Sequence, residues 1–281
     1  MTTIKIVTDS SCTMDPALIE KLNITVVPLS VMVDGVIYAA DEHFDNENFM
    51  TMMAESKTLP KTSQPPIGVF AETYEKLTQD GSTVISIHLT KELSGTYETA
   101  RQASQLTLGN VIVVDSNFID QSLAHQVIKA AEMAQAGATA EEIIHTIKEI
   151  AAHEKLYIGI STLENLVKGG RISRATGLVT NLLNVKLVLE LKDGQFVSKA
   201  KGRGKKAFFK WLQELKGELQ NQPIEKLGIS FAGDPSLAEE LAKEIHSFLP
   251  DLEIPILHTN PIVATHAGDA AFAIMYYTKI S

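Results

Sequence analysis

The stretch TVISIHLTKELSGTY, residues 83–97, decides the fold class of this chain. Residues 83–89 form an apolar, β-prone run of strand length, and Leu93-Ser94-Gly95-Thr96-Tyr97 then opens a helical stretch that extends to residue 107. A buried strand that passes through a short polar loop into a helix is the building unit of α/β proteins. Ligands of such proteins bind beyond the carboxyl ends of the strands, where we expect this loop to lie.

The rest of the first half repeats this alternation of strands and helices. One helix begins with Asp15 as its N-cap and Pro16 at its first helical position. Buried apolar strands that alternate with amphipathic helices predict a mostly parallel N-terminal sheet flanked by helices. The other strands of this half are expected at residues 4–8 and 111–114, and its helices at residues 66–78, 95–107, 120–136 and 139–153.

Turn dipeptides predict two hairpins. Asp34-Gly35 separates strand-like residues 26–33 from residues 36–38, and Lys192-Asp193-Gly194 separates residues 185–191 from residues 195–199.

The second half combines its hairpin with crossover helices, which predicts a mixed sheet. We therefore expect an α/β protein with an N-terminal α/β domain over residues 1–153 and a C-terminal α/β domain over residues 154–281, with the ligand site between them. The strands of this half are expected at residues 157–161, 185–191, 195–199 and 227–231, and its helices at residues 163–168, 174–184, 205–219 and 236–248.

Composition narrows the function classes. A formal net charge of −9 argues against nucleic-acid binding, which needs a basic face. The single cysteine, Cys12, excludes an intramolecular disulfide and fits a reducing compartment, and no apolar run is long enough for a transmembrane helix. The N-terminus lacks the features of a signal peptide, so we expect a cytoplasmic protein. Two basic islands stand out, at residues 199–206 and at Lys168, Arg171 and Arg174.

Three segments carry candidate ligand-binding groups. Thr62-Ser63-Gln64-Pro65 precedes a helix, where free backbone N–H groups favour an anion, although Ser63 or Gln64 could simply cap that helix. The loop around Ser94 has the same alternative. His266 follows an apolar segment and could donate a hydrogen bond or act as a base, but a lone histidine is more often structural.

Enzyme motifs are poorly represented. Ser94 lacks the first glycine of a nucleophile elbow, and no phosphate-binding P-loop is present. Gly202-Arg203-Gly204-Lys205-Lys206-Ala207 matches a dinucleotide fingerprint, but the preceding strand belongs to a hairpin rather than a βαβ unit. Histidine and cysteine do not cluster at zinc spacing.

Five segments in this order resemble the DegV family across essentially the whole chain. They are Thr8-Asp9-Ser10-Ser11, Thr62-Ser63-Gln64-Pro65, Ser94-Gly95-Thr96-Tyr97, Gly170-Arg171-Ile172-Ser173 and Thr265-His266, the last of which we expect in a loop.

The resemblance implies two α/β domains that bury a fatty acid, and a role as the fatty-acid-binding subunit of a bacterial fatty acid kinase. A separate ATP-dependent kinase would phosphorylate the bound carboxylate, and the acyl phosphate would pass to phospholipid synthesis. The implied carboxylate contacts are Thr62, Ser94 and His266, with Ser63 as a neighbour. Ala267 and Asp269 depart from the family pattern after the histidine, as does Pro66 after Gln64-Pro65.

On this interpretation the protein is a carrier without catalytic residues, metal or cofactor, whose ligand is a long-chain fatty acid. Buried methylenes would supply the binding energy, and a few hydroxyls and a histidine would place the carboxylate. Two alternatives remain open at this point. One is an acyl-transfer hydrolase that uses Ser94 and His266, and the other is a ligand-responsive regulator.

Partner contacts are predicted from the basic and apolar segments. Arg171, Arg174 and Arg203 are candidates for docking the kinase or, transiently, an anionic membrane surface. The helix at residues 174–184 carries an apolar stripe, and we expect it to cover the ligand pocket as a lid through Leu178, Leu182 and Leu183. The alternative is a plain core helix.

Overall fold

A computed structural model describes residues 3–41, 44–172 and 185–280. The candidate lid residues Leu178, Leu182 and Leu183 and the docking candidate Arg174 lie outside the described residues.

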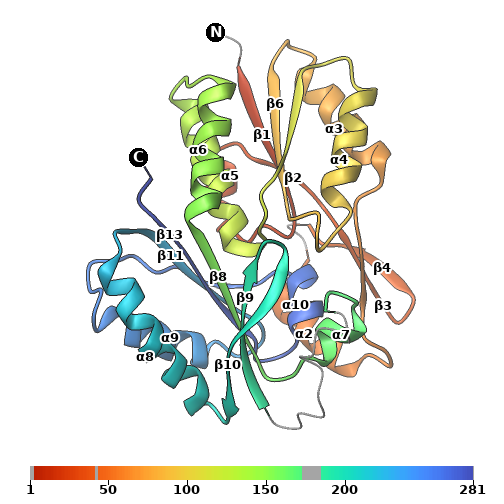
Figure 1. Cartoon of the computed structure of the whole chain (residues 1–281). Helices are drawn as coiled ribbons and strands as arrows, with labels where there is room; N and C mark the ends of the chain where they lie inside the picture. The colour runs from red at the N-terminus through yellow and green to blue at the C-terminus, as the bar shows by residue number, and fades with distance from the viewer. Residues whose placement is uncertain (1–2, 42–43, 173–184, 281) are drawn as a thin grey trace.

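A four-stranded parallel sheet forms the core of the first half, as the sequence predicts. Its strand order is β2-β1-β6-β7, with β1 (Ile4–Asp9), β2 (Thr25–Val27), β6 (Thr83–His88) and β7 (Val111–Asp115). Every residue of β6 is buried, because helices cover both faces of the sheet. Figure 1 shows one pair of helices on each face: α3 (Ile67–Thr78) with α4 (Thr96–Leu106), and α5 (Asp120–Gln135) with α6 (Ala140–His153).

A six-stranded mixed sheet dominates the second half, which confirms the mixed-sheet prediction. Its strand order is β10-β9-β8-β13-β11-β12, and β11 and β12 run parallel while the other neighbouring pairs are antiparallel. The division at residues 153 and 154 stays a prediction. The elements of this sheet and its covering helices are β8 (Glu154–Ile160), β9 (Val185–Lys192), β10 (Gln195–Arg203), α8 (Lys206–Asn221), β11 (Ile224–Phe231), α9 (Ser236–His246), β12 (Ile256–His258) and β13 (Phe272–Thr278).

Both predicted hairpins form. Asp34 and Gly35 have φ angles of 46° and 88°, and Asp193 and Gly194 have 50° and 73°. Positive φ at both central residues is the requirement of the turn type that asparagine–glycine and aspartate–glycine pairs favour.

The single strand predicted over residues 26–33 is wrong. The chain breaks at Pro28, which has no N–H to give to a strand ladder, so β2 joins the parallel sheet and the following strand joins another sheet. That sheet is antiparallel, with order β4-β3-β5 and the strands β3 (Ser30–Val33), β4 (Val36–Ala39) and β5 (Lys61–Ser63).

Short helices and an apolar cluster lie where the two halves meet. The cluster joins Val31 and Phe49 of the first half to Ile158, Leu189 and Ala264 of the second. In Figure 1, α2, α7 and α10 lie beside one another in this region. The bounds of the remaining helices are α1 (Pro16–Lys21), α2 (Asn46–Glu55), α7 (Glu164–Lys168) and α10 (Pro261–Ala267).

A polar seam also crosses between the halves. The buried carboxylate of Asp120 accepts hydrogen bonds from Ser230 Oγ and Thr259 Oγ1, both at 2.6 Å. Asn260 Nδ2 donates to the carbonyl oxygen of Ser11 at 3.0 Å. Buried hydrogen bonds are costly to leave unmade, so this seam fixes the position of α10, which Asn260 caps, against the end of β1.

Two glycine substitutions test the packing of the second half. A methyl group at Gly159 of β8 would overlap the ring of Phe272, so Gly159→Ala should lower the free energy of unfolding by about 1–3 kcal/mol. Gly217 is an exposed position inside α8 with open space around it, so Gly217→Ala should raise that free energy by about 0.5–1 kcal/mol. Urea unfolding of both variants measures the difference, and equal effects of the same sign would contradict this packing.

Candidate ligand site

A cavity lies where the carboxyl end of the parallel sheet, the three-stranded sheet and α10 meet. One group of its lining side chains is polar and comes from both halves of the chain: Ser11, Thr62, Ser63, Gln64, Ser94, Arg171 and His266. The other group is apolar and includes Leu29, Leu89, Ile119, Ile158, Phe196 and Ile262. Such a division suits a ligand with a polar head and an apolar tail.

The free space in this cavity is about 60 Å³. A dry cavity of about 150 Å³ holds benzene. A long acyl chain therefore requires apolar side chains around the cavity to move apart.

Thr62 and His266 are joined by a hydrogen bond, with 2.8 Å between Thr62 Oγ1 and His266 Nε2. Thr62 lies on β5, and its segment continues through Pro65 to the N-cap of α3 at Pro66, so the segment precedes a helix as the sequence suggests. The expectation of a loop at His266 is wrong, because this residue occupies the last turn of α10. Asn260 caps that helix and Pro261 is its first residue, and both are helix start signals that can be read from the sequence.

Burial, with a further contribution from the charge of Arg171, lowers the pKa of His266 to about 3. The imidazole is therefore neutral at physiological pH. Its Nδ1 atom is buried and has no hydrogen-bond partner among the described residues. A buried donor without an acceptor is rarer than an under-used acceptor, so the proton belongs on Nε2 and points to Thr62. This tautomer leaves the Thr62 hydroxyl proton available to a ligand.

Ser94 lies directly before α4. The N-cap of that helix is Gly95, which offers no side-chain cap. Ser94 Oγ accepts a hydrogen bond from the backbone N–H of Thr96 at 3.3 Å and lies 2.9 Å from Thr96 Oγ1. Ser94 therefore satisfies one N–H group at the start of α4, which is the role that the capping alternative gave to it, and it also lines the cavity.

Gln64 belongs to a candidate segment of the sequence but was not among the implied carboxylate contacts, and it lines the cavity. Its Nε2 donates to Thr99 Oγ1 at 2.5 Å, and its side chain lies so close to Gly95 that any larger residue there would overlap it. The capping alternative for Ser63 and Gln64 is wrong, because the N-cap of α3 is Pro66 and no side chain caps the helix.

Arg171 lines the cavity, whereas the sequence suggested it only for docking. Its Nε donates to the carbonyl oxygen of Leu93 at 3.1 Å and its Nη1 to that of Gly169 at 2.7 Å. The guanidinium is half-buried, and this burial lowers the pKa of Arg171. Its remaining donors suit an anionic head group. Arg203, in contrast, is exposed at the end of the edge strand β10.

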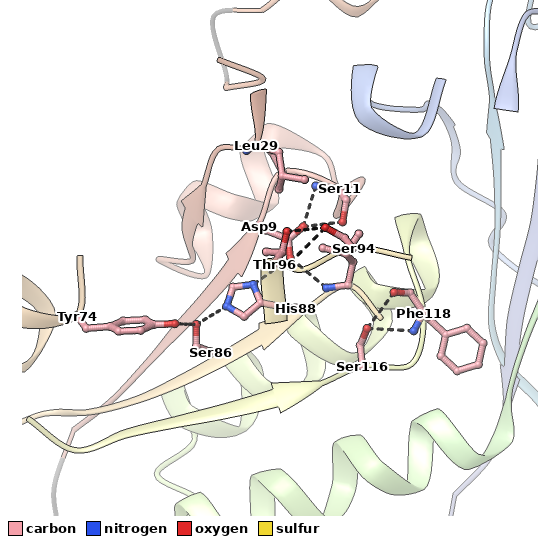
Figure 2. A network of polar contacts seen from close by, with 12 residues as sticks. Asp9, Ser11, Leu29, Tyr74, Ser86, His88, Ser94, Thr96, Ser116 and Phe118 are labelled. Atoms are coloured by element: carbon pink, nitrogen blue, oxygen red, sulfur yellow. Dashed lines mark hydrogen bonds and ion pairs between the residues drawn. The ribbon is translucent and has the colours of Figure 1, made fainter. Parts of the chain in front are cut away.

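The hydrolase alternative gains no support from the geometry. Ser94 and His266 line the same cavity, but their hydrogen-bond partners are Thr96 and Thr62. Figure 2 shows a second set that resembles a catalytic triad, in which His88 lies between Asp9 and Ser86. These three side chains are fully buried and none of them lines the cavity, so Ser86 does not face a substrate there.

Ser11 is the other cavity residue that the sequence did not assign. It belongs to the Thr8-Asp9-Ser10-Ser11 segment at the carboxyl end of β1, next to β6 in the parallel sheet. The rule that ligands bind at these strand ends could have identified it.

Among the described residues, no helix is both long enough and apolar enough to cross a membrane. The same residues contain no group of three or more His, Cys, Asp or Glu side chains that could hold a metal ion.

Comparison with known proteins places the chain in a family. Residues 3–279 match the family described as "Uncharacterised protein, DegV family". A DegV domain-containing protein of Streptococcus pneumoniae is 48% identical over 275 residues, which cover 98% of each chain. The chain therefore belongs to the DegV family.

Solved structures of relatives share the fold. DegV of Bacillus subtilis, described as a fatty acid binding protein, matches with a TM-score of 0.91 and 28% identity, covering 99% of this chain and 100% of that one. A stearic acid-binding protein of Eubacterium ventriosum matches with a TM-score of 0.89 and 26% identity, covering 99% of each chain.

The depressed pKa of His266 predicts a pH dependence of stability. The unfolded chain binds a proton at this residue below pH 6.5, while the folded protein does so only near pH 3. The free energy of unfolding should therefore decrease as the pH is lowered from 6.5 to about 3. The contribution of His266 to this decrease is at most about 1.4 kcal/mol per pH unit. His266→Gln keeps a donor but cannot titrate, so its free energy of unfolding should decline less steeply. Parallel curves for the two proteins in urea unfolding would show that His266 does not titrate as described.

Proposed function

We propose that this protein binds one long-chain fatty acid in the cavity and presents its carboxylate to a separate ATP-dependent kinase. The observation that carries the proposal is the grouping of Thr62, Ser94, Arg171 and His266 beside an apolar wall. Fatty acids bound by solved relatives support the choice of ligand. The acyl phosphate formed by the kinase would then enter phospholipid synthesis.

Affinity and placement are separate tasks on this proposal. Burial of methylenes contributes about 0.8 kcal/mol each, so a sixteen-carbon chain gains roughly 10 kcal/mol before the costs of ordering it and of opening the cavity. The carboxylate adds little net affinity but must be paired, because an unpaired buried charge is severely penalised. Thr62 and Ser94 supply donors, and Arg171 supplies the positive charge.

The carrier role follows from what the cavity residues can do. His266 is neutral and is bonded to Thr62 rather than to a serine, so it activates no serine among the described residues of the cavity. On this proposal the phosphoryl group comes from the kinase, and Arg171, which lines the cavity, would meet it.

Docking of the kinase is assigned to the basic surface that includes Arg203. Lys199, Lys201 and Arg203 are exposed on β10, an edge strand of the six-stranded sheet. An anionic membrane surface is the transient alternative partner for the same groups.

Bound ligand provides the direct test. Mass spectrometry of an organic extract of the purified protein should show a near-stoichiometric amount of long-chain fatty acid. A protein that yields none, and that also fails to bind added palmitate or oleate, does not have this function.

Removal of single head-group donors should separate binding from presentation. Thr62→Val and Ser94→Ala each remove one donor, at a cost of about 1–3 kcal/mol if the carboxylate is left under-paired. Because burial of the chain dominates affinity, both variants should still retain fatty acid, while kinase-dependent acyl phosphate formation falls at least about tenfold.

Thr73→Val is the matched control, because Thr73 bonds to Val69 within α3 and does not line the cavity. Phosphorylation that is unchanged in Thr62→Val and Ser94→Ala would remove these residues from the head-group site.

A further inference from the structure

A chain of buried hydrogen bonds leads from α3 to the cavity through the sheet, and Figure 2 shows it. Tyr74 OH donates to Ser86 Oγ at 2.8 Å, Ser86 Oγ lies 2.7 Å from His88 Nε2, and His88 Nδ1 lies 2.9 Å from Asp9 Oδ2. Ser11 Oγ donates to Asp9 Oδ1 at 2.5 Å. Tyr74, Ser86, His88, Asp9 and Ser11 are all fully buried.

The donors and acceptors of this chain fit one assignment. Ser86 accepts the proton of Tyr74, and the acceptor within reach of its own buried proton among the described residues is His88 Nε2, so the proton goes there. His88 then carries its proton on Nδ1 and donates it to Asp9. Histidine is neutral in this arrangement.

Asp9 must be ionised to complete the assignment. Besides His88, the backbone N–H groups of Ser11 and Leu89 and the hydroxyl of Ser11 all donate to its carboxylate. These donors fill the roughly four lone-pair positions that an ionised carboxylate offers and leave none for a proton of its own.

Ser11 is therefore an acceptor only. Its hydroxyl proton is committed to Asp9, so Ser11 Oγ can offer the cavity lone pairs and no donor. An ionised ligand carboxylate has no proton to give to such a group, whereas a protonated carboxyl group has one.

The charged groups around this end of the cavity come from several elements. Asp9 is the last residue of β1, Asp120 is the first residue of α5, and Arg171 lies in the turn after α7. His266 of α10 and His88 of β6 are neutral, as assigned above. The thiol of Cys12, next to Ser11, has its pKa raised by burial and by Asp9, so it carries no charge. Burial raises the pKa of Asp120, so the carboxylate of Asp9, with its four donors, is the negative group that opposes the guanidinium of Arg171.

We propose that the buried carboxylate of Asp9, held ionised by His88, acts through Ser11 to raise the proton affinity of a carboxyl group bound in the cavity. Asp9 and His88 are positioning residues in this scheme, and Ser11 contacts the ligand. The inference rests on the proposed function, because it names how the same site treats the fatty-acid head group. Its consequence is that the head group accepts and releases a proton nearer to neutral pH than Arg171 alone would allow.

The experiment uses full-length protein loaded with palmitate that is labelled with ¹³C at the carboxyl carbon. The chemical shift of this carbon reports ionisation directly, so a pH titration gives the midpoint for the bound ligand. Asp9→Asn should lower that midpoint by at least about one pH unit, the size expected when a nearby like charge is removed. Ser11→Ala should move it in the same direction, because the protonated carboxyl group loses its acceptor.

Glu154→Gln is the matched control. Glu154 is another buried carboxylate bonded to one serine and one histidine, Ser122 and His125, but it does not line this cavity. Glu154→Gln should leave the midpoint of the bound ligand at the wild-type value. A shift in this variant would mean that the loss of any buried charge moves the midpoint.

The outcomes separate this inference from the proposed function. Wild-type midpoints in both Asp9→Asn and Ser11→Ala would overturn the inference while the carrier function stands. If Asp9→Asn does not fold, an unchanged midpoint in Ser11→Ala alone overturns it. If wild-type protein shows only the signal of unbound palmitate, the proposed function itself fails.

Discussion

The carboxylate of Asp9 is a fully buried charge, and the surrounding strand ends are arranged to satisfy it. A buried charge without partners would cost more than the whole stability of an ordinary domain, so its donors must be in place whenever the protein is folded. They come from the turn that follows β1 and from the end of β6, two strands that are neighbours in the parallel sheet. This requirement fixes the loops at the carboxyl end of the parallel sheet. These loops line one side of the cavity through Ser11, Leu89 and Ser94.

Hydrogen bonds connect these loops to the second half of the chain. The carbonyl oxygen of Ser11 accepts hydrogen bonds from the N–H of Asp120 and from Asn260, at 3.0 Å each. Asn260 in turn caps α10, the helix that carries His266. A continuous set of hydrogen bonds therefore links the end of β1, through Asn260, to the helix that carries His266. A head group placed between Thr62 and Ser94 would contact side chains that are already held by hydrogen bonds, which lowers the entropy cost of ordering them.

The sequence was sufficient for the fold class because the relevant signals are local. Apolar strands that alternate with amphipathic helices predict the parallel sheet, and turn dipeptides predict both hairpins. Two local signals were misread. One was Pro28, which ends β2, and the other was Asn260-Pro261, a standard pair of helix start signals that begins α10.

The site was predicted less completely, for a different reason. Thr62, Ser94 and His266 stood in segments that resemble the family, and the structure brings them to one cavity. Arg171 and Ser11 stood in such segments too, but their roles depend on which way the side chain points, and periodicity within a loop does not encode that. Likewise, the partnership of Asp9 with His88 links residues 79 positions apart, which no local pattern reveals.

The hydrogen bond between Thr62 and His266 has a consequence for how the protein is made. Its partners are separated by 204 positions in the sequence, and the bond from Asn260 to Ser11 spans 249. Contacts between such distant segments form late, because closing long loops costs entropy that only later packing repays. A nascent chain on the ribosome exposes the apolar wall of the cavity before α10 has emerged to cover it. The polar end of the cavity is thus among the last features of the molecule to be assembled.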